Sequence, residues 1–249
     1  MDKHVAIVTG GSRGIGRAIV ERLLADGADV VTCGRGPRPD DLPEAVVWVQ
    51  ADVSQTGDAA RLIKEANRAF GRVTLLVNNA GVQVEKTVAD SDDGDWDLVM
   101  NVNCKGVFNM CRAALADMAG HGGNIINIGS ISGMAADPSM ALYNASKAFV
   151  HGLTRSIAVD HGPKVRCNAI RPGWIMTGMA EDGFALANDP EAAMKDALAR
   201  HPAGRFGKPE DIANIVAWLA SDQSAYLTGE CITMDGGMTA ASPLNPGLF

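Results

Sequence analysis

Residues 9–16 read TGGSRGIG, and they stand between a short apolar run at 5–8 and a segment with helical spacing at 15–24. Glycines in such a turn let the backbone approach a pyrophosphate, and the N-terminus of the following helix offers free N–H groups and a partial positive charge. A glycine-rich turn alone is weak evidence, because many are only tight turns. Its place between a strand and a helix, at the start of an alternating chain, favours dinucleotide binding.

The rest of the chain alternates between strand-like and helix-like segments, which predicts βαβ units and a parallel sheet. The expected strands are nearly continuous apolar runs, as is typical of strands covered by helices on both faces. Right-handed crossovers then give a single-domain α/β fold, a doubly wound Rossmann-type parallel sheet with helices on both faces. The expected strands are 5–8, 30–32, 46–49, 75–77, 125–128, 165–170 and 231–234, and the expected helices are 15–24, 54–70, 96–118, 143–160 and 209–220.

Two regions interrupt this alternation. Residues 34–44 are polar and contain three prolines, which predicts a surface loop in place of a helix. Residues 176–207 form an insertion with helical pieces and are a candidate substrate lid. No linker or repeat divides the chain, so residues 1–249 are expected to form one NAD(P)-binding catalytic domain.

Composition and charge exclude several classes of protein. Hydrophobic residues make up 47% and charged residues 20% of the 249 residues, values typical of a globular chain rather than a disordered one. A net charge of -7 repels polyanions, so we expect no nucleic-acid partner. No secretory signal and no apolar stretch long enough to span a bilayer is found, so we expect no membrane partner.

The cysteines and histidines indicate neither a disulfide framework nor a metal site. The five cysteines are widely spaced and include no CxxC pair, which favours a reducing, cytoplasmic compartment. None of the five histidines forms an HxxxH or HExxH pair, so no catalytic metal is expected. His151, four residues after Lys147, is interpreted as a helix surface or interface residue.

The end of the second expected strand bears on the choice of cofactor. An acidic residue there would bind the ribose hydroxyls of NAD. The sequence instead reads TCGR at 32–35, and Arg13 lies in the glycine turn. Two guanidinium groups near one ribose suit a 2′-phosphate, so Arg13 and Arg35 predict a preference for NADP(H) over NAD(H). The alternative is that both are solvated surface arginines.

Tyr143 and Lys147 form a candidate acid–base pair. On a helix, residues four apart share a face. A free phenol has a pKa of about 10, and a nearby ammonium lowers it, which would prepare Tyr143 to exchange a proton with a carbonyl or alcohol oxygen. Ser130 stands at the carboxyl end of an expected strand, where a hydroxyl can bind the reacting oxygen. The alternatives are that the spacing of Tyr143 and Lys147 arises by chance and that Ser130 is an ordinary turn residue. For Asn103 the alternative is a solvent-facing helix residue.

Taken together, these motifs resemble the short-chain dehydrogenase/reductase family in its compact branch of about 250 residues. The resemblance spans nearly the whole chain and rests on separate motifs in order. They are TGGSRGIG at 9–16, Asp52-Val53, NNAG at 78–81, Asn103, Ser130, Tyr143 with Lys147, Pro172-Gly173 and DGG at 235–237.

The resemblance implies a catalytic tetrad of Asn103, Ser130, Tyr143 and Lys147. By analogy Tyr143 is the general acid or base, Ser130 polarises the substrate oxygen, Lys147 lowers the pKa of Tyr143 and binds the nicotinamide ribose, and Asn103 holds a relay water. The residues expected to bind the cofactor are Gly10, Ser12, Arg13, Gly14, Ile15, Gly16, Arg35, Asp52, Val53, Asn79, Gly81, Tyr143, Lys147, Pro172, Gly173, Ile175 and Thr177.

The expected function is therefore NADP(H)-dependent interconversion of a ketone and a secondary alcohol by hydride transfer. The substrate is expected to be a small molecule, bound mainly by apolar residues in 134–140, 174–179 and the lid. Alternatives are a 3-oxoacyl-carrier-protein reductase, a non-catalytic dinucleotide-binding sensor or scaffold, and a nucleotide-sugar epimerase or dehydratase, for which the chain is too short. The resemblance also implies a homotetramer, with Ala113, Ala114, Phe149 and Val150 compatible with packing against a neighbouring subunit.

Overall fold

The computed structural model describes residues 4–241, in which seven parallel strands form one sheet in the order β3-β2-β1-β4-β5-β6-β7. Every strand expected from the sequence is present, with its ends shifted by at most two residues. The strands are β1 Val5–Thr9, β2 Asp29–Gly34, β3 Val47–Gln50, β4 Leu75–Asn78, β5 Gly123–Ile128, β6 Val165–Pro172 and β7 Cys231–Met234.

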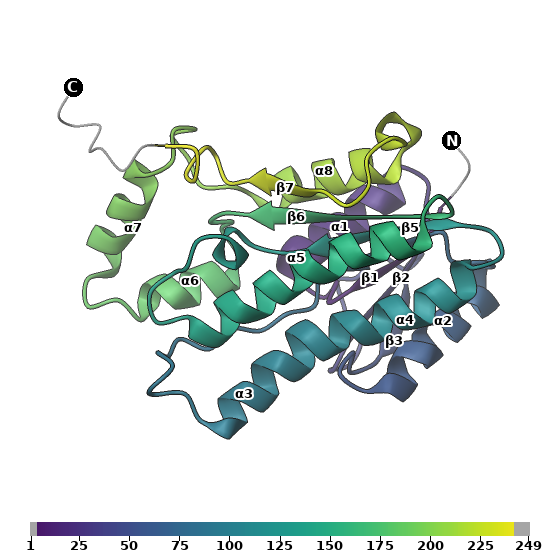
Figure 1. Ribbon diagram of the computed structural model, residues 1–249, viewed down its shortest axis with the longest axis horizontal. Helices are drawn as coiled ribbons and strands as arrows, with labels where there is room; N and C mark the ends of the chain where they lie inside the picture. Colours follow the sequence, from purple (N-terminus) through teal and green to yellow (C-terminus); the bar gives the residue numbers. More distant parts are fainter. Residues whose placement is uncertain (1–3, 242–249) are drawn as a thin grey trace.

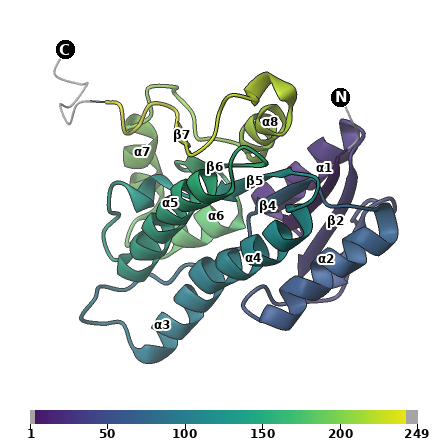
Figure 2. The ribbon, with the colours of Figure 1, turned by 45° about the vertical axis from the view of Figure 1, so that its right-hand side comes forward.

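Helices cover both faces of this sheet (Figures 1 and 2). One layer contains α1 Gly14–Ala25 and α8 Pro209–Ala220, and the other contains α2 Thr56–Phe70, α4 Val107–Met118 and α5 Ala141–His161. Figure 2 shows α4 between α2 and α5. The sequence-based expectation of a doubly wound Rossmann-type fold is confirmed.

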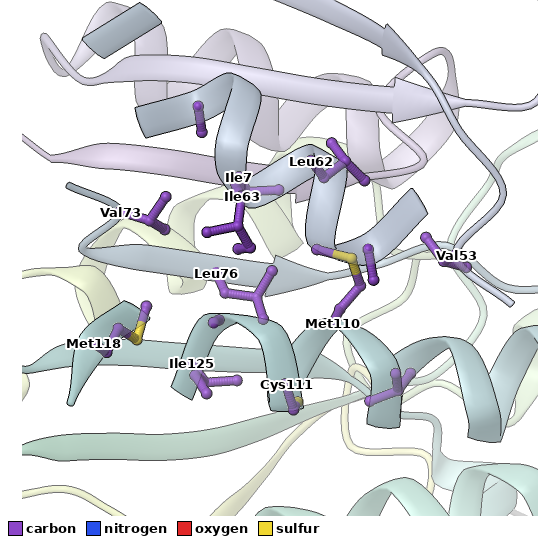
Figure 3. Close-up of a cluster of buried hydrophobic side chains, with 14 of the residues drawn as sticks. Ile7, Val53, Leu62, Ile63, Val73, Leu76, Met110, Cys111, Met118 and Ile125 are labelled. Carbon is purple, nitrogen blue, oxygen red and sulfur yellow. The ribbon is translucent and has the colours of Figure 1, made fainter. Parts of the chain in front are cut away.

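Two hydrophobic cores, one on each face, follow from the alternation of side chains along β1. Ala6 and Val8 point to one face and pack with α1 and α8, whereas Val5 and Ile7 point to the other face and pack with α2 and α4. Figure 3 shows this second core, where Leu62 from α2 and Met110 from α4 lie near Ile7 and Leu76 of the sheet. Both faces of β1 are therefore buried, which holds the glycine turn that follows it in a fixed position.

The strand order places a crevice at the carboxyl ends of β1 and β4. The chain runs from β1 outward through β2 to β3, then returns to β4 on the other side of β1. Ligands of open α/β sheets bind at such a reversal, outside the carboxyl ends of the strands. The helical pieces expected in 176–207 are α6 Gly178–Ala185 and α7 Pro190–Ala199, and Figure 1 shows them beyond the carboxyl ends of β6 and β7.

The helix expected over 96–118 begins earlier and is not uniform. It starts with α3 Asp93–Met100, where the side chains of Asp92 and Asp95 form a capping box. A π-helical segment, Asn101–Gly106, joins α3 to α4. Single-turn π-helical insertions of this kind often occur at functional sites. None of the helices within residues 4–241 is long and apolar enough to cross a membrane.

The loop over 34–44 contains no helix, as the sequence predicted, and is held by an arginine. The guanidinium of Arg38 donates hydrogen bonds to the carbonyl oxygens of Val46, Leu42 and Pro43 at 2.7–3.0 Å. The guanidinium of Arg38 is therefore bound within the loop. The side chain of the neighbouring Arg35 makes no such hydrogen bonds among the described residues.

Candidate active site

The glycine turn after β1 leaves room for a ligand at the start of α1. Gly10 and Gly14 have φ values of 70° and 58°, a conformation that favours glycine. At Gly16 a Cβ atom would lie 2.3 Å from the carbonyl oxygen of Gly10. No side chain caps the N-terminus of α1, so its N–H groups remain available to an anion. This turn fits the pyrophosphate of a dinucleotide.

The carboxyl ends of β1 and β4 are joined by side-chain hydrogen bonds. Asn79 Nδ2 donates to the carbonyl oxygens of Thr9 and Gly10, at 2.9 and 3.2 Å. Thr9 Oγ1 accepts hydrogen bonds from the backbone N–H groups of Asn79 and Ala80, both at 3.0 Å. These contacts fix the floor of the crevice beside the glycine turn.

A cleft of about 410 Å³ extends over the carboxyl ends of the strands. Its lining includes every residue that the sequence predicted to bind the cofactor. Of the predicted tetrad, Ser130, Tyr143 and Lys147 line the cleft, and Asn103 lies behind its wall. No group of three or more His, Cys, Asp or Glu side chains within 4–241 is placed to hold a metal ion.

Arg13 and Arg35 lie at the same end of this cleft, next to the glycine turn. Both side chains are exposed and line the cleft, and neither is paired with a carboxylate among the described residues. No acidic residue ends β2, whose last residues are Thr32, Cys33 and Gly34. Asp52, an acidic lining residue that follows β3, accepts a hydrogen bond from the Ser54 backbone N–H through its side chain. This end of the cleft is therefore rich in free positive charge.

Tyr143 and Lys147 lie one turn apart on α5, in surroundings that shift the pKa of both groups. Burial raises the pKa of Tyr143 to about 12, and a hydrogen bond with Ser130 opposes this rise only in part. Lys147 Nζ donates to the Ile128 carbonyl oxygen at 2.9 Å and lies 5.5 Å from the Tyr143 ring centroid. Burial lowers the pKa of Lys147 to about 8. Burial therefore has the largest effect on the pKa of both groups.

Asn103 lies in the π-helical segment and points inward rather than to solvent. Its Nδ2 donates to the Val82 carbonyl oxygen at 2.8 Å and to Ser146 Oγ at 3.0 Å, and its Oδ1 accepts from the Val82 backbone N–H at 2.9 Å. A Cβ atom at Gly81 would lie 3.4 Å from Asn103 Oδ1 and 3.8 Å from Lys147 Nζ. Asn103 and Lys147 thus approach the cleft at the same point, beside Gly81.

Ser130 lies two residues after the end of β5 and begins a chain of hydroxyl groups that sequence reasoning missed. Its Oγ donates to Ser132 Oγ at 2.9 Å and accepts from the Ser132 backbone N–H at 3.1 Å. Ser132 Oγ in turn donates to Asp137 Oδ2 at 2.5 Å. Both Ser132 and Asp137 line the cleft. Asp137 falls within the predicted substrate-binding stretch 134–140, but its spacing from Ser130 carried no signal.

The opposite wall of the cleft is apolar, with polar groups at its edge. Trp174 stacks on Phe184 of α6 with ring centroids 4.6 Å apart. Gln83 Nε2 donates to Glu85 Oε1 at 3.2 Å, and both residues line the cleft. The expectation of a mainly apolar substrate side is therefore incomplete, since it left out Glu85 and the carboxylate of Asp137. Of the apolar residues expected there, Met140, Trp174 and Met179 line the cleft, whereas Met134, Met176, Phe184 and Leu186 do not.

Three other residues are placed differently from the expectation. His151 is buried rather than exposed, because its ring packs against Gly129 and Gly133. Burial, together with nearby cations, lowers its pKa to about 4. Ala114 and Val150 belong to the core of the protomer and cannot contact a neighbouring subunit, whereas Phe149 is 40% exposed.

Comparison with known proteins agrees with this geometry. A family model described as Enoyl-(Acyl carrier protein) reductase matches residues 10–239. The chain is 39% identical to 2-(S)-hydroxypropyl-CoM dehydrogenase 3 of Xanthobacter autotrophicus, over 96% of this chain and 98% of that one. It is 36% identical to the 3-oxoacyl-[acyl-carrier-protein] reductase FabG of Thermotoga maritima, over 96% and 98% of the two chains.

A third relative is the NADP-dependent (R)-specific alcohol dehydrogenase of Lentilactobacillus kefiri, 39% identical over 95% of this chain and 96% of that one. The structure of aldohexose dehydrogenase from Thermoplasma acidophilum in ligand-free form superposes with a TM-score of 0.91 at 31% identity, covering 97% and 96% of the two chains. The relatives, the fold and the glycine turn agree, and the chain belongs to the short-chain dehydrogenase/reductase family of oxidoreductases.

Proposed function

We propose that the protein is an NADP(H)-dependent oxidoreductase that interconverts a ketone and a secondary alcohol. One observation carries this proposal: Ser130, Tyr143 and Lys147 line the same cleft as the glycine turn and the uncapped N-terminus of α1. The names of the relatives, which include an NADP-dependent alcohol dehydrogenase, support the same reaction class. A bound nicotinamide dinucleotide supplies or accepts the hydride.

The protein's own residues handle the proton and the substrate oxygen. In reduction, Tyr143 Oη gives its proton to the oxygen of the carbonyl as the carbon receives the hydride. In oxidation the Tyr143 phenolate takes the proton of the alcohol. Ser130 Oγ binds and polarises the same oxygen. Lys147, held by the Ile128 carbonyl oxygen, stabilises the phenolate in that step and would bind the ribose of a nicotinamide cofactor. Asn103, linked to Val82 and Ser146, holds the wall beside Lys147.

The test of this assignment is the Tyr143→Phe variant, assayed with a panel of ketones by loss of NADPH absorbance. The phenylalanine removes only the hydroxyl that exchanges the proton, so kcat should fall by about 100-fold or more. Dinucleotide affinity should stay within twofold of the wild type, which shows that the cleft is intact. Substantial activity of Tyr143→Phe would refute the role of Tyr143, and a wild type that binds dinucleotide without reducing any ketone would favour a non-catalytic sensor or scaffold.

The preference for NADP(H) is proposed from the two unpaired arginines at the end of the cleft. Guanidinium groups bind phosphate through paired, charge-assisted hydrogen bonds. A double variant in which both Arg13 and Arg35 are changed to alanine should bind NADPH about 10- to 100-fold more weakly than the wild type. Its binding of NADH should be nearly unchanged. The matched control is Arg38→Ala, which removes a loop arginine that is already bound to three carbonyl oxygens. An equal loss for both cofactors in the double variant would contradict the phosphate contact.

A second candidate is the reduction of a 3-oxoacyl group on an acyl carrier protein. The FabG relative and the description of the matching family model favour it. Such an enzyme needs a basic surface to dock an acidic carrier protein, and the net charge of -7 argues against one. Retention of the protein on immobilised carrier protein at low salt would support this candidate, and a lack of retention would favour a free small-molecule ketone.

We also infer a homotetramer, a substrate lid at 176–207 and a cytoplasmic location. An apolar groove of about 470 Å³ runs between α4 and α5, with Phe108 at 44% exposure, and it fits a contact with a second subunit. All five cysteines are free, which fits a reducing compartment. Light scattering coupled to size-exclusion chromatography should give four times the mass of one chain, and a Phe108→Asp variant should give a smaller species.

A further inference from the structure

The substrate end of the cleft carries negative charge that the proton transfer does not use. Glu85 and Asp137 both line the cleft. Three lysine or arginine side chains of the described residues line it as well: Arg13 and Arg35 lie at the cofactor end, and Lys147 belongs to the proposed catalytic group. Resting on the function proposed above, we propose that the substrate is a ketone or secondary alcohol that carries an ammonium group, and that Glu85 and Asp137 select it over an anionic substrate.

The segment that carries Glu85 is fixed on both sides of that residue. On one side, the backbone N–H and carbonyl oxygen of Val82 are bound by the side chain of Asn103 at 2.9 and 2.8 Å. On the other side, the Lys86 carbonyl oxygen accepts a hydrogen bond from the Ala141 backbone N–H at 3.3 Å. Because Ala141 begins α5, this contact places the segment beside the helix that carries the acid–base pair.

Glu85 also faces the candidate lid. A Cβ atom at Gly183 of α6 would lie 3.3 Å from Glu85 Oε1 and 3.9 Å from Gln83 Nε2. Gln83 Nε2 in turn donates a hydrogen bond to Glu85 Oε1 at 3.2 Å. The carboxylate therefore lies where the lid helix meets the cleft, which is the substrate side rather than the side of the glycine turn.

Asp137 brings the second carboxylate to the same end from the loop before α5. Asn144, the residue after Tyr143, holds the backbone of Asp137 through two hydrogen bonds, at 3.0 Å to its carbonyl oxygen and 3.4 Å from its N–H group. Ser132 Oγ donates to Asp137 Oδ2 at 2.5 Å. No lysine or arginine within residues 4–241 forms an ion pair with Glu85 or Asp137, so neither charge is neutralised.

The cations on the segments around this end do not line the cleft. Lys86 is paired with a carboxylate of α3 at 2.6 Å, and Arg171 donates to Met134 Sδ at 3.1 Å. In the lid segment, Arg200 and Arg205 form ion pairs with other carboxylates at 3.0 and 2.6 Å. An anionic group that extends beyond the reacting carbonyl would therefore meet two like charges and no free cation.

The uncharged part of the same wall suits the alkyl groups of an ammonium ion. Trp174 and Met179 line the cleft, and Trp174 stacks on Phe184 with ring centroids 4.6 Å apart. Every lining residue between 174 and 183 is uncharged. Aromatic rings attract cations through their negative faces, and methyl groups bury well against apolar side chains. Carboxylates beside an aromatic and apolar wall are the chemistry that recognises a substituted ammonium group.

Three ketones of similar shape and different charge test the proposal. Acetonyltrimethylammonium is a cation, methyl neopentyl ketone is neutral, and acetonesulfonate is an anion. Each carries a tetrahedral group one methylene away from the carbonyl. The assay is kcat/KM for each ketone with NADPH at neutral pH, and the wild type should prefer the cation to the anion by about tenfold or more. Comparing each variant with the wild type cancels the intrinsic reactivity of the ketones.

Glu85→Gln and Asp137→Asn each remove one charge and keep the shape of the side chain. Each should lower the ratio of kcat/KM for the cation to that for the anion by about three- to tenfold. Glu85→Lys should also raise kcat/KM for acetonesulfonate about threefold or more, a gain that damage to the fold cannot produce. The matched control is Glu210→Gln, which removes the same charge from an exposed position of α8 outside the cleft. It should leave the ratio within about twofold of the wild type.

The outcomes are distinct. A ratio that falls in the Glu85 and Asp137 variants but stays in Glu210→Gln supports the proposal. An equal fall in Glu210→Gln, or a loss of kcat/KM by the same factor for all three ketones, would overturn it. If circular dichroism shows that Asp137→Asn does not fold, the two Glu85 variants decide alone. A wild type that prefers the anion overturns this inference and leaves the proposed function in place, whereas a wild type that binds NADPH and reduces no ketone overturns both.

Discussion

Glycine at position 16 is required by the space around it, not by its backbone angles. A Cβ atom there would lie 2.3 Å from the Gly10 carbonyl oxygen and 2.4 Å from Asn79 Nδ2, two atoms that form the floor of the cleft. Gly16→Ala should therefore displace the turn, lower dinucleotide affinity by about tenfold or more and destabilise the fold by roughly 1–3 kcal/mol. Titration with NADPH and urea unfolding measure the two effects.

The matched control for this change is Gly57→Ala, in the first turn of α2. No atom lies within 4 Å of the position its Cβ would take, so the methyl group meets open space. Alanine there should leave binding unchanged and stabilise the protein by roughly 0.5–1 kcal/mol. Equal binding by Gly16→Ala and the wild type would contradict the close approach described for the turn.

At the residue scale, the sequence identified side chains that carry a motif and missed those that depend on loop geometry. Tyr143 and Lys147 were predicted because a four-residue spacing on a helix fixes their relation. Ser132 and Asp137 were not, because they meet only through a loop whose path depends on Asn144 and on the positive φ of Ser139. Burial raises the pKa of Tyr143, an effect that a four-residue motif cannot reveal.

The π-helical segment is an element that the periodicity of the sequence did not distinguish from an ordinary helix. It turns Asn103 toward Val82 and Ser146, with which the side chain forms three hydrogen bonds. Asn103→Ala should lower the free energy of unfolding by roughly 1–3 kcal/mol, because it leaves buried partners unpaired. Asn101→Ala, in the same segment and without a side-chain hydrogen bond among the described residues, should change it by less than about 0.5 kcal/mol. Equal effects in urea unfolding would show that the three hydrogen bonds are not what holds the segment.

The insertion between β6 and α8 contains the least buried helix of the described chain. No residue of α7 is buried, whereas α2 buries four. Elements with few buried contacts open locally at low free energy. Limited trypsin digestion should therefore cut first at Lys195 or Arg200, before any site in α2 such as Lys64. A first cut within α2, read by mass spectrometry, would contradict the assignment of 176–207 as a mobile lid.

At the scale of the whole molecule, buried thiols make the fold sensitive to alkaline pH. Burial raises the pKa of Cys33 and Cys104 from 9.0 to about 11, that of Cys111 to about 12, and that of Cys167 well above its ordinary value. A group whose pKa is raised by folding contributes stability that is complete below its unfolded pKa and is lost as pH rises through its folded pKa. Stability should therefore decrease from about pH 9 upward.

Lys147 has the opposite effect on the free energy of unfolding. Burial lowers its pKa from 10.5 to about 8, so the cost of burying it falls as rising pH removes its proton. Four thiols outweigh one lysine, so the free energy of unfolding should fall by roughly 2–4 kcal/mol between pH 8 and 10. Urea unfolding at the two pH values, under reducing conditions, measures this difference. A Cys111→Ala variant should show a smaller fall, and a wild-type stability that is constant or rises over this range would contradict the burial of the thiols in their protonated form.

The strands, the doubly wound parallel sheet and the helices on both of its faces were predicted from the sequence, because alternation, right-handed crossovers and the glycine turn leave few arrangements. The assembly of subunits could not be predicted, since the helix residues thought to face a neighbour include Ala114 and Val150, which are buried in the protomer. The outward faces of α4 and α5 also carry apolar side chains, Phe108 and Phe149, so the residue types alone did not separate the two faces.

The central claim is that the cleft over the carboxyl ends of β1 and β4 binds NADPH. The most direct test is a pair of equilibrium titrations of the wild-type protein with NADPH and NADH, followed by nicotinamide fluorescence. The account predicts saturable binding of both, with NADPH bound about tenfold or more tightly because of Arg13 and Arg35. Tighter binding of NADH would contradict the phosphate contact, and binding of neither would contradict the assignment of the cleft.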